Sequence, residues 1–260
     1  MSIARLSSRA LIGFSGPDWR AFLQGQLTQD VLTLQPGEAR FAALLTPQGR
    51  LMFDLFVIGR DDGAWLDVAV EHRDALIQRL TLYRLRAKVE IAADDAPVFA
   101  LFNQTPGESW IIDPRRPQLG ARGYGLDVQT DATEADYEAF RLALGVPGPA
   151  DWAGDKTYPI DANFDLLAGI DFKKGCFVGQ ETTSRMKRRG QIKNRMLPIT
   201  FDGPPPPHGA EVLAGELRAG EVLSGMDGHA MALLRLDRIE GAALTVDGRP
   251  VTVERPDWLL

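Results

Sequence analysis

The sequence predicts an α+β protein that ends in a small antiparallel β-barrel, and three observations carry this prediction. Two apolar or alternating runs, 41–46 and 51–59, are separated by a Pro-Gln-Gly turn and predict a β-hairpin. Apolar residues three and four positions apart predict amphipathic helices over 19–27 and 74–83. Short strand-like runs separated by glycine-rich turns fill residues 201–260, which is typical of a small barrel.

The remaining elements of the N-terminal part follow from local signals. A first strand is expected over 4–12, and Ser15 with Asp18 is expected to cap the first helix. Thr133 and Asp136 form a second capping pair, which opens a helix that ends at Gly145. Proline and glycine predict a loop over 114–125. Further strands are expected at 64–70, 88–92, 98–102 and 110–112.

A domain boundary is expected at four consecutive prolines, Pro204–Pro207, because a polyproline segment is a stiff spacer. We therefore predict a first region over 1–200, with one or two subdomains, and a barrel over 201–260. The barrel strands are expected at 211–213, 221–223, 231–236, 243–246 and 251–253.

Composition excludes several classes of protein. The chain has 260 residues, one cysteine and three histidines, so it can form no internal disulfide and has too few soft ligands for a structural zinc or a self-held iron–sulfur cluster. No apolar run reaches the roughly 18 residues of a membrane span. The net charge of −6 argues against a general nucleic-acid binder. We expect a cytoplasmic monomer, because a lone cysteine fits a reducing compartment and nothing demands a partner subunit.

The lone cysteine, Cys176, lies in the segment with the most chemistry. Lys173 and Lys174 precede it, and a helix is expected from about 179 to 189. Positive charge and a helix N-terminus both favour a thiolate, so Cys176 is a candidate reactive thiol. The alternative is a small buried apolar side chain, and both interpretations stay open.

Positive charge gathers in the same segment. Residues 173–195 sum to +7 and the rest of the chain to −13, with Glu181 as the only acid among these bases: Lys173, Lys174, Arg185, Lys187, Arg188, Arg189, Lys193 and Arg195. Such a patch suits a polyanion, either a carboxylate tail, a phosphate group or an RNA backbone. A solvated helix face is the alternative. No aromatic residue lies between 186 and 195 to stack a base.

A second candidate is Asp54, a carboxylate inside an apolar hairpin strand, where it needs a partner or a function. The chain lacks the Gly-x-Ser-x-Gly nucleophile elbow and the glycine-rich phosphate and dinucleotide loops. Nucleophilic serine triads and nucleotide loops are therefore disfavoured.

The segment KGCFVGQE at 174–181 closely resembles the signature of the YgfZ family of folate-binding, iron–sulfur-associated proteins, relatives of the glycine-cleavage T-protein. Further blocks at 22–31, 44–50, 83–86 and 141–147 resemble the family in the same order. The resemblance implies a folate-binding region of mixed sheets and helices around a central hole, followed by a β-barrel. It also implies tetrahydrofolate as ligand, iron–sulfur enzymes or cluster carriers as partners, and a role in making or repairing such enzymes, including those that thiolate tRNA.

The resemblance assigns roles to residues of the signature and of the folate region. Cys176 would act as a thiolate near folate, tuned by Lys174. The remaining signature residues would shape the loop and the helix start: Gly175, Phe177, Gly179, Gln180, Glu181 and Arg185. Asp54 would pair with the pterin, and Arg141 or Arg185 would hold the glutamate carboxylates.

Two departures from the T-protein pattern weaken the case for aminomethyl transfer. T-proteins carry an Asp-Asp pair where Phe53-Asp54 stands, and a Glu where Ala143 stands. Whether the chain is an enzyme stays open. A folate-dependent aminomethyl or one-carbon transferase is one alternative, and a tRNA-binding accessory protein that uses Arg188 and Arg189 is the other.

Overall fold

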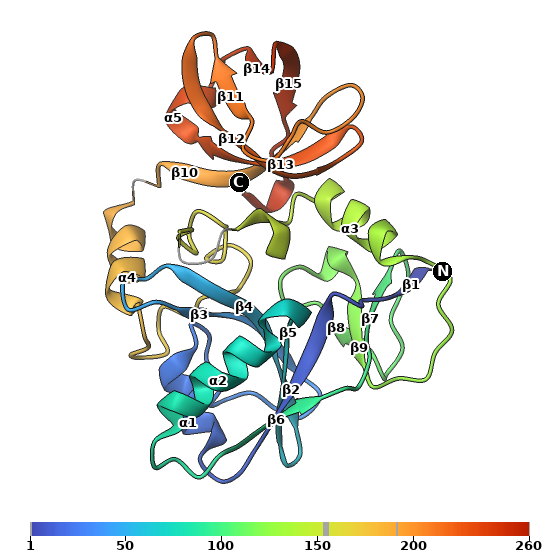
Figure 1. Cartoon of the computed structure of the whole chain (residues 1–260), viewed down its shortest axis with the longest axis vertical. Coiled ribbons are helices and arrows are strands. Elements are labelled where there is room, and N and C mark those ends of the chain that lie inside the picture. The colour runs from blue at the N-terminus through green and yellow to red at the C-terminus, as the bar shows by residue number, and fades with distance from the viewer. Residues whose placement is uncertain (1, 153–155, 191, 260) are drawn as a thin grey trace.

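The computed structural model describes residues 2–152, 156–190 and 192–259, and it consists of two antiparallel sheets and a closed barrel (Figure 1). Within the described chain no helix is long and apolar enough to cross a membrane.

The first sheet has five strands and carries the predicted hairpin. Its helices, α1 (Trp19–Gln26) and α2 (Arg73–Arg84), share an apolar core with one of its faces. Because side chains alternate along a strand, the other face holds a different set, which includes Asp54. The strand order is β3 (Ala39–Leu45), β4 (Leu51–Arg60), β5 (Gly63–Ala69), β2 (Arg9–Ser15) and β6 (Glu90–Asp94).

The second sheet shares its core with the other face of the first. Helix α3 (Glu134–Ala143) contacts its edge strand. The strand order is β1 (Ser2–Arg5), β7 (Val98–Phe102), β9 (Ala121–Tyr124) and β8 (Ile111–Ile112). Buried polar side chains of β4, β5 and β9, among them Asp54, Asp67 and Arg122, lie on the sides of the two sheets that face each other.

The barrel closes because its last strand pairs with its first. Its core is apolar and separate from the other two cores. The order is β10 (Asn194–Thr200), β13 (His229–Arg235), β12 (Leu217–Met226), β11 (Glu211–Ala214), β14 (Leu244–Val246) and β15 (Arg249–Val253), with the short α5 (Leu236–Ile239) after β13. In Figure 1 it caps one end of the molecule, opposite α1 and α2.

Several elements differ from their prediction. The expected first strand is two strands, β1 and β2, which belong to different sheets. The expected loop over 114–125 contains η2 (Pro117–Leu119) and β9. The four prolines connect β10 to β11 inside one barrel, so they separate no domains; β10 also places barrel residues before position 201.

The two predicted helix caps have different outcomes. At α3 the capping box forms, with Thr133 Oγ1 accepting from the Asp136 backbone N–H at 3.2 Å. At α1 neither Ser15 nor Asp18 caps the helix. The Asp18 carboxylate instead accepts a hydrogen bond from the Lys88 backbone N–H at 2.7 Å, which ties the start of α1 to the segment before β6.

Candidate functional site

Asp54 lies on the inner face of β4 and lines a cavity of about 330 Å³. The residue is 2% exposed. Its Oδ2 accepts from Arg9 Nη1 at 3.3 Å, whereas its Oδ1 is buried and has no hydrogen-bond partner among the described residues. A buried carboxylate oxygen without a donor is costly, and Asp54 carries one such unused acceptor while another part of the residue lines the cavity.

A buried ion network surrounds Asp54, and sequence reasoning missed it. Asp67 on β5 accepts from Arg9 Nε at 2.6 Å, from Arg122 Nη1 at 2.8 Å and from the Tyr124 hydroxyl at 3.2 Å. Burial alone would lower the pKa of Arg9, but the charges of Asp67 and Asp54 raise it above its usual value. Burial, reinforced by Asp67, raises the pKa of Tyr124 well above its usual value, so this hydroxyl stays a donor.

The network continues through β9 toward α3. Asp113 accepts from Arg115 Nη2 at 2.7 Å and from Arg122 Nε at 3.4 Å. Arg122 lies 3.9 Å from the centroid of the Phe56 ring, which also lines the cavity. Burial would raise the pKa of Asp113, but Arg115 and Arg122 lower it below its usual value. The cavity therefore has a fixed, ionised wall beside an aromatic ring.

Arg141, one of the two arginines expected to hold the glutamate carboxylates, lines the same cavity from α3. Its guanidinium donates to Glu138 Oε2 from Nε at 3.0 Å and from Nη2 at 2.6 Å, and to the Val146 carbonyl. Its Nη1 also lies 3.5 Å from Asp151 Oδ2. Burial would lower the pKa of Arg141, but Glu138 and Asp151 raise it. Arg141 is thus held by protein acids in the structure.

The predicted reactive loop lies beside α1 and the turn of the first sheet's hairpin. Lys174 Nζ donates to the Gln24 carbonyl at 2.6 Å and to the Leu27 carbonyl, both at the C-terminal end of α1. Gln24 Nε2 donates back to the Lys174 carbonyl at 3.2 Å. Burial lowers the pKa of Lys174 to about 8, although Asp30 and Asp171 oppose the shift. Lys174 therefore fastens the loop to α1.

Cys176 is exposed, so the alternative of a small buried apolar side chain is wrong. Gly175 before it has φ +97°, which favours glycine. Phe177 after it is buried in the core and lies 5.3 Å from Lys174 Nζ. The exposed thiol therefore lies between two anchored side chains, those of Lys174 and Phe177.

Two glycines bring the loop and the hairpin into backbone contact. Gly179 precedes α4 (Gln180–Arg189) and has φ +80°, as does Gly49 in the hairpin turn. A Cβ on Gly179 would lie 2.6 Å from the Thr46 carbonyl oxygen and 3.0 Å from Gly49 Cα. A Cβ on Gly49 would lie 2.8 Å from Thr182 Cβ. Neither position has room for a larger residue.

The basic segment is less uniform than its sequence. Arg195 is buried and donates to Asp165 at 2.6 Å, and Lys187 lies 3.5 Å from the same carboxylate. Arg185, Arg188 and Glu181 are exposed on α4, and Gln180 is half-buried. The side chain of Arg189 lies outside the described residues. Arg185 lies on neither cavity described here, so the structure does not bring it together with Asp54 and Arg141.

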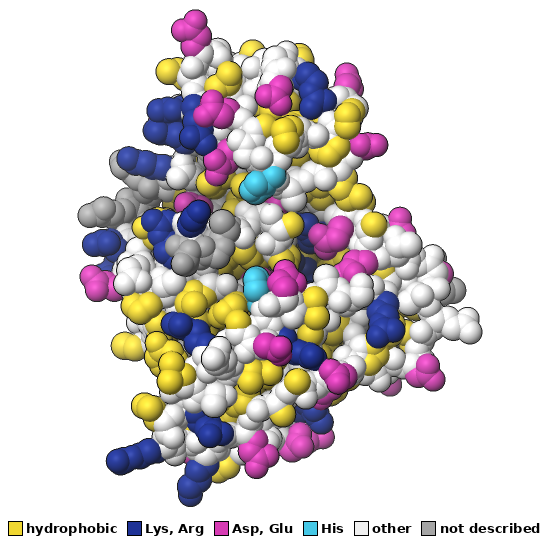
Figure 2. Space-filling model, in the orientation of Figure 1, with side chains coloured by type: hydrophobic (Ala, Val, Ile, Leu, Met, Phe, Trp, Pro, Cys, Tyr) yellow, Lys and Arg dark blue, Asp and Glu magenta, His cyan; other side chains and the backbone are white. Residues whose placement is uncertain are grey.

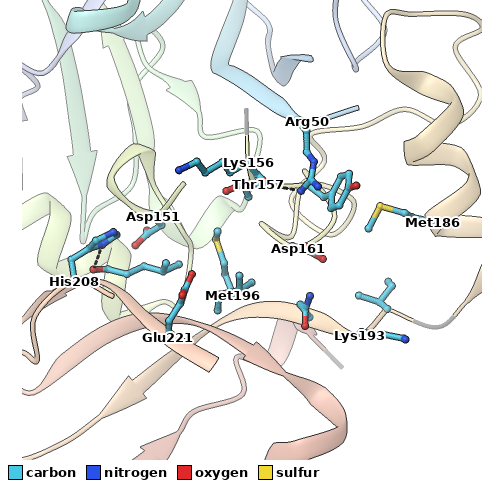
Figure 3. Close-up of a pocket in the computed structure, with 15 residues that line it drawn as sticks. Arg50, Asp151, Lys156, Thr157, Asp161, Met186, Lys193, Met196, His208 and Glu221 are labelled. Atoms are coloured by element: carbon cyan, nitrogen blue, oxygen red, sulfur yellow. Dashed lines mark hydrogen bonds between the residues drawn. The ribbon is translucent and has the colours of Figure 1, made fainter. Parts of the chain in front are cut away.

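A second cavity, of about 520 Å³, separates the barrel from the N-terminal region (Figure 3). Arg50 stacks over Tyr158 at 3.5 Å from the ring centroid, and Asp161 faces the same space. Burial raises the pKa of Asp161 to about 6, against the opposing charges of Arg195 and Arg50. Sequence reasoning missed this cavity, because the residues come from the hairpin, from an aperiodic segment and from the barrel.

No group of three or more metal-ligating side chains occurs within residues 2–152, 156–190 and 192–259.

Comparison with known proteins identifies relatives of the whole chain. A protein named iron–sulfur cluster assembly factor IBA57 homolog, mitochondrial, from Mycosarcoma maydis is 28% identical over 99% of this chain and 83% of its own length. The Mus musculus protein of that name is 29% identical over 98% of this chain and 84% of its own. The Phaeosphaeria nodorum homolog is 33% identical, and the match spans 76% of this chain but only 55% of that relative.

These relatives overturn one expectation. Each is named mitochondrial, so the prediction of a cytoplasmic protein is wrong on this comparison. The physical reason is that a lone cysteine indicates a reducing compartment without telling one such compartment from another.

Structure and family comparisons agree on the architecture. The glycine cleavage system aminomethyltransferase T from Bartonella henselae superposes with a TM-score of 0.78 at 18% identity, covering 99% of this chain and 86% of its own. A family model described as the C-terminal β-barrel domain of CAF17 matches residues 193–260. The predicted fold class is confirmed: the chain is an α+β protein with the T-protein fold and a closed C-terminal antiparallel β-barrel.

Proposed function

We propose that this chain acts in the assembly or repair of iron–sulfur cluster enzymes and binds tetrahydrofolate in the cavity beneath Asp54. The observation that carries the folate proposal is the buried, unpartnered Asp54 Oδ1 at that cavity. The cluster role is supported by the relatives, which are named iron–sulfur cluster assembly factors. Enzymes that thiolate tRNA are among the expected clients.

The donors and acceptors of the cavity fit a pterin. A pterin ring presents neighbouring N–H groups, and a carboxylate accepts such a pair. Arg9 already donates to Asp54 Oδ2, so one pterin N–H would use the unpartnered Oδ1 and the other would share Oδ2 with Arg9. Phe56 and Tyr137 line the cavity and give a planar ring an aromatic contact. In this arrangement the chain's own residues bind and orient folate.

Two arginines, Arg141 and Arg185, are candidates to bind the glutamate carboxylates of folate. Arg141 contacts Glu138 and Asp151, so a ligand carboxylate would have to compete with both. Arg185 is exposed on α4 and is free to meet a flexible tail. We therefore assign Arg141 to the cavity wall, and Arg185, which does not line the cavity, would meet only a carboxylate tail that extends out of it.

Cys176 is the residue we assign to the cluster or to its carrier. A four-cysteine cluster needs more thiolates than one chain with a single cysteine supplies, so Cys176 would share the cluster, as cargo, with ligands of a partner. Its exposure lets a macromolecular partner reach it. Lys174 would position the thiol by fixing the loop to α1.

The test is the activity of a four-iron, four-sulfur enzyme in cells that lack this chain. Wild type should restore the activity, whereas Cys176→Ser and Asp54→Asn should not. Asp62→Asn, on the exposed turn after β4, is the matched control and should restore it. Restoration by Cys176→Ser would contradict the thiol assignment, and failure of the wild type would contradict the cluster role.

A binding measurement separates the two sites. Purified wild type and Cys176→Ser should bind tetrahydrofolate equally in a calorimeter, while Asp54→Asn should lose binding by about 1–3 kcal/mol, the cost of losing a hydrogen bond to a charged group. Equal binding by Asp54→Asn would place folate elsewhere.

Aminomethyl transfer is the second candidate, because the T-protein fold spans the chain and Asp54 lies at its cavity. Phe53 lies on the opposite face of β4 in the core beneath α2, so a carboxylate there would face away from the cavity. Ala143 is exposed at the end of α3. A transferase should turn over an aminomethyl donor with tetrahydrofolate, losing turnover in Asp54→Asn and keeping it in Cys176→Ala.

A further inference from the structure

We propose that the turn after α2 is a docking surface for a partner protein that presents an apolar pocket ringed by carboxylates. The turn spans residues 84–87, and we call it the Leu85 turn. It lies at the end of the molecule opposite the barrel (Figure 1). This surface is separate from the cavity beneath Asp54 and from the thiol, so the inference does not depend on the proposed function.

The backbone of Leu85 is strained. Its φ is 48° and its ψ −107°, and the Ala87 N–H donates to the Arg84 carbonyl at 2.8 Å. These angles are close to the first central position of a type II′ turn, which glycine occupies without steric cost. A leucine there costs free energy, and strained residues gather at functional sites.

The Leu85 side chain contributes little to the stability of the fold. It is 88% exposed, so it buries almost no apolar surface inside this chain. Leu82, one helical turn earlier, is 73% exposed, and Tyr83 is 40% exposed. A hollow of about 350 Å³ lies beside Leu85, between the turn, Gly16–Pro17 and Glu90. Two leucines therefore project from one end of α2 without a partner in the described residues.

The positive charge around these leucines indicates what kind of partner surface would bind them. Residues 79–88 contain four cations and no acid, although the whole chain carries −6. Arg86 and Lys88 are exposed, and Arg79 lies 5.1 Å from the centroid of the Tyr83 ring. Figure 2 shows Lys and Arg side chains extending from this end of the molecule. Positive charge around an apolar projection complements a negative rim around an apolar pocket.

A protein fits this surface better than an RNA does. Phosphate groups would satisfy the cations, but a nucleic-acid backbone offers no apolar pocket for Leu82 and Leu85. Apolar anchors that enter a pocket carry most of the binding energy of a protein interface, whereas surrounding charges set its rate and salt dependence.

The test begins with a photo-crosslinking amino acid, p-benzoylphenylalanine, at position 85 of the full chain in its own cells. Leu217, a 63% exposed leucine on the barrel, is the control position. Position 85 should capture one protein that position 217 does not, and mass spectrometry identifies it. No capture above the control, or capture of RNA, would overturn the proposal.

The captured protein is then purified and titrated against variants of this chain. Leu85→Gly should weaken binding about tenfold while raising the denaturation midpoint, because it removes the anchor and the backbone strain together. Arg86→Glu should weaken binding further at low salt, whereas Arg5→Glu, at an exposed cation on β1, should not. Unchanged affinity in Leu85→Gly, or a salt-independent interaction, would overturn the proposal even if the crosslink formed.

Discussion

The cavity beneath Asp54 and the loop that carries Cys176 differ in how far their functional groups are exposed to solvent. The cavity is walled by side chains from several strands and from α3, and the charges of Arg9, Asp54 and Arg122 on this wall are buried and paired. The loop exposes its one reactive group, and its anchors are the hydrogen bonds between Lys174 and α1 and the burial of Phe177 in the core. A small ligand needs preformed walls, whereas a thiol that meets another macromolecule needs access.

The first prediction concerns the removal of the Asp67 charge from the buried ion network beside the cavity. Asp67→Asn removes a charge that pairs with both Arg9 and Arg122, leaving each of these buried cations with only its more distant carboxylate, Asp54 or Asp113. We expect the free energy of unfolding to fall by about 3–5 kcal/mol in urea denaturation. Asp62→Asn, five residues earlier on an exposed turn, should change it by less than about 0.5 kcal/mol. Similar values for the two variants would show that the network stabilises nothing.

The second prediction concerns the anchor that holds the Cys176 loop against α1. Lys174→Met keeps the apolar stem but removes the donor to the Gln24 and Leu27 carbonyls. The loss should be about 2–3 kcal/mol, because these hydrogen bonds come from a charged group. Amide exchange should accelerate over residues 173–178 and stay unchanged over β4. Uniform acceleration would mean that the loop and the hairpin unfold together.

The third prediction uses pH to examine the cavity below the barrel. Burial raises the pKa of Asp161 to about 6, so the folded state favours the protonated form. The contribution to stability is full below the unfolded pKa of about 4 and is lost as pH rises through 6. Between pH 4 and pH 8 wild type should lose about 1–2 kcal/mol more than Asp161→Asn does. Parallel pH profiles for the two proteins would contradict this.

The smallest expected effect is at the thiol itself. Cys176→Ser changes an exposed side chain with no role in the core, so the free energy of unfolding should move by less than about 0.5 kcal/mol. A larger loss in thermal or urea unfolding would make Cys176 structural and would remove the contrast between the two regions.

Local signals predicted much of the fold. The hairpin, the strand over 98–102 and the capped helix α3 all depend on neighbours a few positions apart, and all three are confirmed. The prolines misled because stiffness alone does not distinguish a linker between domains from a connection between strands of one barrel.

The site was predictable only where one residue carried its own signal. Asp54 stood out as an acid in an apolar strand, and it lines the cavity. Arg9, Asp67 and Arg122 meet because β2, β5 and β9 come together, and no spacing along the chain encodes that meeting. The resemblance named Arg141 without showing that Glu138 and Asp151 already hold it.

The contact between Gly49 and Gly179 has a consequence for how the molecule moves. The two backbones approach closely there, and the neighbouring Thr182 Cβ and Leu45 Cβ do not move when a rotamer changes, so little space is left to absorb a displacement. We therefore expect the start of β4, which carries Asp54, and the start of α4, which follows Cys176, to move together. A side chain at either glycine would push the hairpin turn away from the loop.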